Sequence, residues 1–213
     1  LLIEPKGMEP TKHQYDYDVA TVYAFLQKYG LEHEIKVNIE TNHATLSGHD
    51  FHHEVATAVN AGIFGSIDSN AGDDRLGWDL DLFPTSVEDM SLGLIEILRG
   101  GGFTTGGMMF DCKLRRQSIS RDDLFIAHIG GMDVLAKSLL VAQSIIDEGE
   151  LDRRRDERYA GWNESSAQDI LNGKVTLQQI HDDLIESGHE PEPVSGRQEL
   201  LDRLVARHID TVR

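Results

Sequence analysis

The fold is decided by residues 35–43, which read Ile35-Lys36-Val37-Asn38-Ile39-Glu40-Thr41-Asn42-His43. Apolar side chains alternate along the first part of this stretch, a spacing that predicts a β-strand. The strand ends at Glu40, and His43 follows three residues later. A carboxylate and an imidazole placed this way at the end of a strand are candidate metal ligands.

The same pattern, a short apolar strand that ends in a carboxylate, occurs four times. Between the strands lie segments with apolar residues at helical spacing, such as Val19, Val22 and Leu26 before a stop at Gly30. Strands that alternate with single helices predict a parallel sheet. The acids that end the four strands, at intervals of 36, 28 and 43 residues, are Glu4, Glu40, Asp68 and Asp111.

Signals for helix ends occur further along the chain. Thr85 and Glu88 form a capping box, which predicts the start of a helix, and Gly100 predicts its end. A long helix is expected after a basic loop and runs to about residue 149. The charge run over residues 152–158 predicts a solvated helix.

These repeats predict an α/β fold: the second half, four βα units, of a (β/α)8 TIM barrel, with a helical C-terminal tail. A full barrel has eight units and about 250 residues, whereas this chain has 213 residues. The half barrel with metal-binding strand ends is expected over residues 1–149, and the tail, for subunit contacts, over residues 150–213. Because the chain opens on an apolar strand without an initiator methionine, we expect a fragment.

The composition is that of a folded protein with a large acidic surplus. The net charge is −17, with 39% hydrophobic and 27% charged residues. Phosphates repel such a surface, which argues against nucleic-acid and membrane partners. One cysteine, Cys112, fits a reducing compartment, and no apolar run approaches the roughly 18 residues of a membrane span. We therefore expect a cytoplasmic protein.

The acids at the strand ends predict a metal site, since four carboxylates around one mouth of a barrel repel one another without cations. Further ligands are offered by His43 and by the loop Trp78-Asp79-Leu80-Asp81. Such oxygen-rich sets suit Mg²⁺ or Mn²⁺, with Co²⁺ as an alternative, whereas zinc is less favoured. Seven ligands exceed the needs of one octahedral ion, so two ions are expected. The candidate ligands are Glu4, Glu40, His43, Asp68, Asp79, Asp81 and Asp111.

Lys6 lies two residues beyond the first strand-end acid. It fits either an ordinary surface ion pair or an ammonium group that polarises a substrate carbonyl beside the metals, and the residues alone leave both interpretations open. Three histidines, His49, His52 and His53, are expected on a helix away from the strand ends, where they would be surface or helix-packing residues.

Several motifs together resemble the second half of xylose isomerase, and the class II bacterial type fits best. Gly7 departs from the family signature, which usually has a second proline there, and this affects the stiffness of a loop rather than a ligand. The resemblance extends along essentially the whole chain. Its segments are Ile3-Glu4-Pro5-Lys6 through Pro10, Asn38-Ile39-Glu40-Thr41-Asn42-His43, Asp68, Gly77-Trp78-Asp79-Leu80-Asp81, Gly106-Gly107-Met108-Met109-Phe110-Asp111, Arg115-Arg116-Gln117-Ser118, Tyr159-Ala160-Gly161-Trp162 and Ser195-Gly196-Arg197-Gln198.

The resemblance implies an aldose–ketose isomerase that converts D-xylose to D-xylulose and D-glucose to D-fructose by a two-metal-assisted 1,2-hydride shift. Lys6 would hydrogen-bond the carbonyl oxygen at C1, and Asp81 would help to move the hydroxyl proton. Glu40 would bridge the two ions. The first ion would be held by Glu4, Glu40, Asp68 and Asp111, and the second by Glu40, His43, Asp79 and Asp81.

The resemblance also implies partners, since the ring-opening histidine, its aspartate and the aromatic walls belong to the first half of the family's chain. The expected partners are the sugar, the N-terminal half of the barrel, and further copies in a dimer or tetramer. One alternative is a non-catalytic metal-binding half barrel that is inactive alone or self-associates. Another is a different metal-dependent isomerase or a phosphate-handling barrel, disfavoured because the sequence has no Gly-rich phosphate loop.

Overall fold

The computed structural model describes residues 1–9, 12–73, 75–114 and 117–213. Three motif residues of the resemblance, Pro10, Arg115 and Arg116, lie outside these ranges. The chain divides into two compact units, of which the first comprises Leu1–Ser144 with Ala206–Arg213 and the second comprises Ile145–Val205. The first unit holds the β-sheet, and the second is helical.

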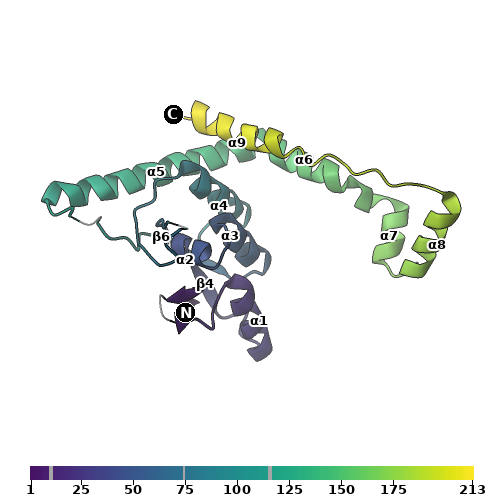
Figure 1. Ribbon diagram of the computed structural model, residues 1–213, viewed down its shortest axis with the longest axis horizontal. Helices are drawn as coiled ribbons and strands as arrows, with labels where there is room; N and C mark the ends of the chain where they lie inside the picture. Colours follow the sequence, from purple (N-terminus) through teal and green to yellow (C-terminus); the bar gives the residue numbers. More distant parts are fainter. Residues whose placement is uncertain (10–11, 74, 115–116) are drawn as a thin grey trace. The chain divides into compact units, whose positions relative to one another are not determined.

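A four-stranded parallel sheet forms the centre of the first unit (Figure 1). Glu40 pairs in register with Asp68, so two of the strand-end acids lie side by side. The predicted α/β fold is confirmed, and the sheet is consistent with part of a TIM barrel. The strand order is β1 (Leu2–Ile3), β4 (Lys36–Glu40), β5 (Phe64–Asp68) and β6 (Met108–Met109).

Helices follow the strands and cover the sheet. The helix α3 packs against α1, α4 and the strands β4 and β5. The buried core between these elements includes Val37, Ile67, Leu26, Val55 and Ile97. A small antiparallel pair, β2 (Met8–Glu9) and β3 (Lys12–His13), follows β1. The helices of this unit are α1 (Val19–Tyr29), α2 (Thr41–Leu46), α3 (Phe51–Asn60), α4 (Val87–Arg99), α5 (Arg121–Glu148) as far as Ser144, and the end of α9 (Gln198–Thr211) from Ala206.

Helix ends agree with the sequence signals at most positions. Gly30 ends α1 in the left-handed conformation, with a φ of 67° that a glycine adopts without strain. Gly100 ends α4 as predicted. The predicted start at Thr85 was wrong by one residue, because the neighbouring hydroxyl of Ser86 accepts the hydrogen bond from the backbone nitrogen of Asp89, at 3.2 Å.

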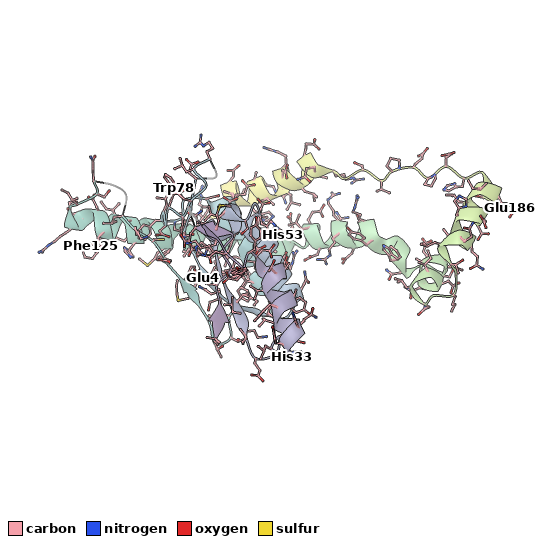
Figure 2. The ribbon with its side chains drawn as sticks, turned by 60° about the horizontal axis from the view of Figure 1, so that its bottom comes forward. Glu4, His33, His53, Trp78, Phe125 and Glu186 are labelled. Atoms are coloured by element: carbon pink, nitrogen blue, oxygen red, sulfur yellow. The ribbon has the colours of Figure 1, made fainter. Side chains whose placement is uncertain are left out.

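The long helix α5 is apolar over much of its length. An 18-residue stretch of it carries few charged side chains, and 22% of that stretch is buried. By length and composition this helix could cross a membrane, so the expectation that no segment approaches such a span was wrong. One such helix is weak evidence, because long helices of soluble proteins meet the same criterion. Phe125 is among its exposed apolar side chains (Figure 2).

The second unit consists of short helices with exposed side chains. Among the described residues of α6, α7 and α8, none is buried. In α6 the carboxylate of Glu150 lies 2.6 Å from the guanidinium of Arg154, and that of Asp152 lies 3.0 Å from Arg155, so the predicted solvated helix is confirmed. The elements are α6 (Glu150–Tyr159), η1 (Ala160–Asn163), α7 (Ser165–Leu171), α8 (Leu177–Ser187) and the first part of α9 (Gln198–Thr211).

Candidate metal centre

The ends of the strands bring all seven predicted ligands into one cluster. Three groups of potential ligands occur there, and in each group one nitrogen or oxygen from every member lies within 4.8 Å of the others. Glu40 belongs to all three groups and is therefore the centre of the cluster. The groups are Glu4 with Glu40 and His43, Glu40 with Asp68 and Asp111, and Glu40 with Asp79 and Asp81.

Glu40 is 1% exposed and directly precedes α2. Its Oε1 accepts a hydrogen bond of 2.7 Å from Asn70, and its Oε2 is buried with no hydrogen-bond partner among the described residues. Burial raises the pKa of Glu40 to about 9, and the nearby carboxylates of Asp79, Glu4 and Asp111 add to the increase. A carboxylate in this position needs positive charge beside it to ionise at neutral pH.

His43 lies in the first turn of α2, where its imidazole reaches three carboxylates. Its Nε2 is 3.0 Å from Asp79 and 3.2 Å from Glu40. Its Nδ1 is 3.3 Å from Glu4 and has no hydrogen-bond partner in the part of the chain that the structure describes. The turn that follows β4 therefore points one nitrogen ligand into a group of oxygen ligands.

Lys6 reaches the cluster from the loop after β1. Its Nζ donates a hydrogen bond of 2.9 Å to Asp79 and forms an ion pair of 2.7 Å with Glu9. Burial lowers the pKa of Lys6, but the contacts with these two acids outweigh it and hold the pKa above its usual value. Lys6 therefore carries a positive charge at the edge of the ligand cluster.

Asp79 and Asp81 share a loop, but their environments differ. Burial raises the pKa of Asp79, yet the hydrogen bonds with His43, Asp81 and Lys6 reverse the effect and lower the pKa below its usual range. For Asp81, burial together with the neighbouring Asp79 raises the pKa, against the opposing effect of its ion pair with Lys113. Two adjacent carboxylates thus have pKa values that are pushed apart.

Asp81 has an unusual backbone conformation. Its φ is 48°, in the left-handed region that aspartate adopts more readily than most residues. Its carbonyl oxygen accepts a hydrogen bond of 2.7 Å from the backbone nitrogen of Lys113. Such conformations often occur at functional sites, where the surrounding structure maintains them.

The residues fit divalent cations. Three buried polar atoms of the cluster, Glu40 Oε2, His43 Nδ1 and Asp79 Oδ1, have no hydrogen-bond partner among the described residues. Six carboxylates and one imidazole provide mostly oxygen donors, the set that Mg²⁺, Mn²⁺ and Co²⁺ accept. The cluster could therefore hold divalent cations.

Comparison with known proteins agrees with this chemistry. The xylose isomerases of Salmonella dublin, Salmonella enteritidis PT4 and Salmonella gallinarum are each 58% identical to this chain over 209 residues, which is 98% of the chain. This chain is similar to the C-terminal half of xylose isomerase. The alignment covers 48% of each relative, so the chain spans about half the length of the curated relatives that it matches and corresponds to their C-terminal half. A family model described as the XylA2 C-terminal domain matches residues 155–209. The predicted resemblance is confirmed.

Two asparagines to which the sequence analysis assigned no role hold candidate ligands in place. Asn38 donates hydrogen bonds to Asp68, at 2.7 Å, and to Glu4, at 3.3 Å. Asn70 donates to Glu40 and, at 3.1 Å, to the carbonyl oxygen of Asp111. Each amide therefore connects two strand ends. Polar residues inside apolar strand patterns were the signal that could have identified Asn38.

A third amide, Asn42, fixes the loop that carries the second pair of aspartates. Its Oδ1 accepts a hydrogen bond of 2.8 Å from the backbone nitrogen of Leu80, between Asp79 and Asp81. Gly72 makes this contact possible, because a Cβ at that position would lie 2.2 Å from Nδ2 of Asn42. The two aspartates thus depend on an uncharged residue for their position.

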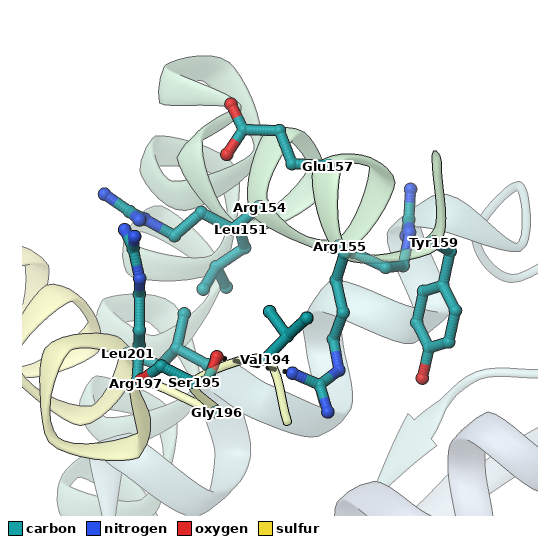
Figure 3. A pocket seen from close by; sticks show the side chains of 11 residues that line it. Leu151, Arg154, Arg155, Glu157, Tyr159, Val194, Ser195, Gly196, Arg197 and Leu201 are labelled. Carbon is teal, nitrogen blue, oxygen red and sulfur yellow. Dashed lines mark hydrogen bonds between the residues drawn. The ribbon is translucent and has the colours of Figure 1, made fainter. Parts of the chain in front are cut away.

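A separate hollow is lined largely by residues of the segment that the XylA2 C-terminal domain model matches (Figure 3). Its volume is about 350 Å³, and its lining includes Leu151, Val194 and Leu201. The charged groups that line it are mainly guanidinium groups, which repel metal cations. It is therefore not a candidate metal centre of this homologue. Its arginines are Arg154, Arg155, Arg158 and Arg197.

Proposed function

We propose that this chain is the metal-holding half of a xylose isomerase that converts D-xylose to D-xylulose and D-glucose to D-fructose by a 1,2-hydride shift. Relatives with that name support the reaction class. The observation that carries the proposal is the position of Glu40, which is buried and belongs to three ligand groups at once. A single carboxylate shared in this way can bridge two cations.

The proposed centre holds two divalent ions, with Mg²⁺ as the first choice and Mn²⁺ or Co²⁺ as alternatives. Bound ions would polarise the oxygen atoms of the sugar and stabilise negative charge that develops on them. Asn38, Asn70 and Asn42 keep the ligands in position. We assign Glu4, Glu40, Asp68 and Asp111 to the first ion, and Glu40, His43, Asp79 and Asp81 to the second.

Lys6 is proposed as the donor to the carbonyl oxygen at C1. Its two carboxylate contacts fix the direction of the ammonium group and raise its pKa, so the group stays protonated at neutral pH. A fixed positive charge next to a carbonyl stabilises the oxygen as it gains charge. The role requires Lys6 to exchange one of these contacts for the substrate.

Asp81 is proposed as the group that accepts and returns the hydroxyl proton. Its raised pKa lies closer to neutrality than that of an ordinary aspartate, which suits proton transfer, whereas Asp79 stays ionised. The contact with Lys113 holds the Asp81 carboxylate toward the loop after β6. Two neighbouring aspartates would thus have different roles.

The proposed partner is an N-terminal half that completes a TIM barrel, in a cytoplasmic homo-oligomer, a dimer or tetramer, held by the tail over residues 150–213. Among the described strands, β1 and β6 each pair with one neighbour in the four-stranded sheet. Leu2 and Met109 on these strands are 40% and 46% exposed. Such edges pair readily with further strands, which supports the closure of the half barrel over residues 1–149.

The test combines this chain with a separately produced N-terminal half of a homologous xylose isomerase, in the presence of Mg²⁺. Ketose formation from D-xylose and the mass in solution are measured together. We expect negligible turnover by the chain alone and turnover by the complex. Metal binding by a complex without turnover would favour the alternative of a non-catalytic half barrel. Robust turnover by a monomer would contradict the division of roles.

A further inference from the structure

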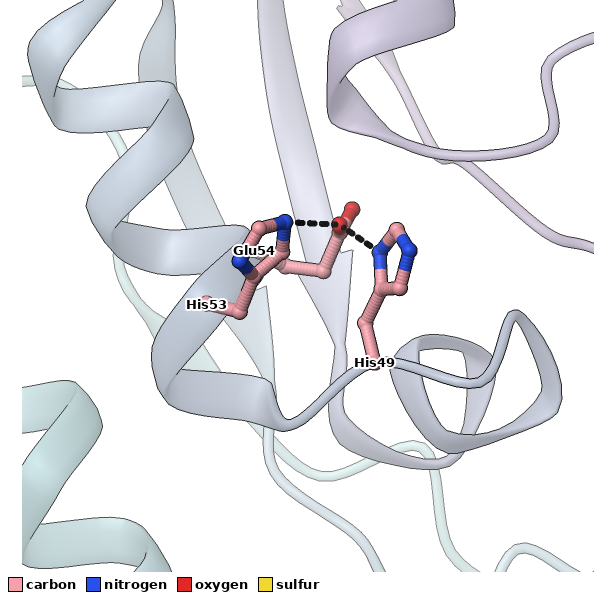
Figure 4. A group of neighbouring side chains, drawn as sticks. All are labelled: His49, His53 and Glu54. Atoms are coloured by element: carbon pink, nitrogen blue, oxygen red, sulfur yellow. Dashed lines mark hydrogen bonds and ion pairs between the residues drawn. The ribbon is translucent and has the colours of Figure 1, made fainter.

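A second cluster of possible metal ligands lies on the helices, away from the strand-end centre. His53 and Glu54 belong to the first turn of α3, and His49 lies in the turn just before it (Figure 4). The expectation that all three histidines of this segment lie on a helix was therefore wrong for His49. The two imidazole rings of the cluster are 4.6 Å apart and meet edge to face. One ligand atom from each of the three residues lies within 4.8 Å of the others.

Glu54 is the fixed member of the cluster. It is 3% exposed, and its Oε1 lies 2.6 Å from Nδ1 of His49 and 4.0 Å from Nε2 of His53. Its other oxygen accepts a hydrogen bond of 2.8 Å from the backbone nitrogen of Val19, the first residue of α1. One carboxylate oxygen is thus anchored, while the other faces both imidazoles.

The outer side of His49 also faces a carboxylate. Its Nε2 lies 4.0 Å from Asp18, the residue that caps α1. Histidine ligands of metals commonly present the second ring nitrogen to a carboxylate, which fixes the ring orientation. The start of α1 therefore contacts both residues, because Asp18 faces His49 and the backbone nitrogen of Val19 donates to Glu54.

We propose that His49, His53 and Glu54 bind a zinc ion. Two imidazoles and one carboxylate are a ligand set that zinc accepts, and a fourth position open to water is normal for such a set. Tetrahedral zinc requires about 3.3 Å between ligand atoms, given metal–ligand bonds of about 2.0–2.1 Å. On zinc binding, the 2.6 Å distance between Glu54 Oε1 and His49 Nδ1 would lengthen. The 4.0 Å distance between Glu54 Oε1 and His53 Nε2 would shorten.

The exposure of the ligands permits this rearrangement. The side chain of His53 is 57% exposed, so it can rotate toward Glu54 and leaves a path for the ion. His49 is 28% exposed, whereas Glu54 is held from behind. The strand-end centre differs in chemistry, since it has one imidazole among six carboxylates. A bound zinc ion would connect α3 to the start of α1 and stabilise the packing of these two helices.

The experiment titrates Zn²⁺ into the chain by calorimetry, with excess Mg²⁺ present to occupy the oxygen-rich centre. His53→Ala removes one proposed ligand. His52→Ala is the matched control, because His52 is the adjacent exposed histidine of α3 and contacts Glu96 instead, at 3.4 Å. We expect His53→Ala to lose one zinc site, or to weaken it at least tenfold, while the His52→Ala variant binds like the wild type.

Thermal unfolding with and without Zn²⁺ provides the second measurement. The rise in melting temperature caused by Zn²⁺ should persist in the His52→Ala variant and disappear in the His53→Ala variant, with equal melting temperatures for both in the absence of zinc. Zinc binding that His53→Ala leaves unchanged, or that both substitutions weaken equally, would overturn the proposal. In that case the cluster joins α1 and α3 by hydrogen bonds alone. A loss of Mg²⁺ binding at Glu40 would concern only the strand-end centre. It would not affect the proposed zinc site at His49, His53 and Glu54.

Discussion

The acidic residues at the strand ends and those in α6 have opposite environments. In α6, Glu150 and Asp152 lie on an exposed helix, and each carboxylate lies within 3.0 Å of a guanidinium group. At the strand ends, Glu40 is buried among other carboxylates and its Oε2 has no hydrogen-bond partner among the described residues. The acids of α6 are therefore paired with charges of their own helix, whereas Glu40 lies among other carboxylates that, together with burial, raise its pKa.

Local spacing explains the difference. In α6 the opposite charges are three or four residues apart, so they meet on one face of a helix. Each strand-end acid instead follows a short apolar run, and the parallel sheet brings these ends to one edge. An excess of acid in the composition thus says little about function until the placement of the acids is known.

The largest effect is expected for Lys6→Met in the reconstituted enzyme. Turnover should fall about 10²–10³-fold, since a positive charge beside the carbonyl oxygen is lost, while both metals still bind. Lys174→Met is the control, because Lys174 also pairs with an aspartate, at 2.8 Å, but is 67% exposed in the second unit. Near-normal turnover of the Lys6→Met enzyme would return Lys6 to the interpretation of a surface ion pair.

The next effect concerns Glu40→Gln, compared with Glu157→Gln in α6. Mg²⁺ at about 100 times its dissociation constant should stabilise the wild-type chain by about 2.7 kcal/mol for each ion bound, and a chelator should reverse this. Glu40→Gln should abolish the stabilisation, because both ions lose a shared ligand. Glu157→Gln should leave it intact. Thermal unfolding with and without Mg²⁺ measures both. An unchanged melting temperature after chelation of the wild type, together with no heat of Mg²⁺ binding, would contradict the metal centre.

Metal binding should also depend on pH through Glu40. Its pKa of about 9 in the metal-free chain exceeds the ordinary value of 4.5, so between these limits a cation displaces a proton when it binds. The affinity of the centre for the cation should therefore rise as the pH increases toward 9, by up to about tenfold per pH unit. Calorimetry in buffers of different ionisation enthalpy would detect the released proton. Binding without proton release at pH 7 would show that Glu40 is already ionised.

The smallest effect is expected in α6. Arg153→Ala removes contacts with Glu150 and Glu157 on an exposed helix. Exposed pairs contribute little to stability, so the melting temperature should change by less than about 2 °C. A larger change would show that the charges of α6 are not simply solvated, and the contrast between the two acidic regions would weaken.

The sequence indicated which candidate ligands lie close together better than it indicated the groups that support them. Glu4, Asp68 and Asp111 could be assigned because each follows an apolar strand, and parallel topology brings such positions together. Its position inside an apolar strand pattern marks Asn38, but its partners and those of Asn70 could not be predicted, because a neutral amide is equally compatible with a turn or a surface. Their contacts join strands that are about 30 residues or more apart in the chain.

Local signals also failed where two residues could serve the same purpose. Thr85 and Ser86 both carry a hydroxyl, and in the structure Ser86 is the residue that caps α4. Lys113 lies in a basic loop whose charges suggested no particular partner, yet it contacts Asp81 across 32 residues. Such choices depend on tertiary packing, which a single sequence does not show.

The unequal lengths of the strands have a consequence for the rate at which the sheet opens. β4 and β5 each have five residues, whereas β1 and β6 have two. Amide protons of β4 and β5 should therefore exchange with solvent most slowly, and those at the two edges should exchange through local fraying. Glu40 and Asp68 lie in the slow pair, while Glu4 and Asp111 follow the edge strands. These candidate ligands would thus become ordered in two stages. Glu40 and Asp68 would be ordered first, and Glu4 and Asp111 afterwards.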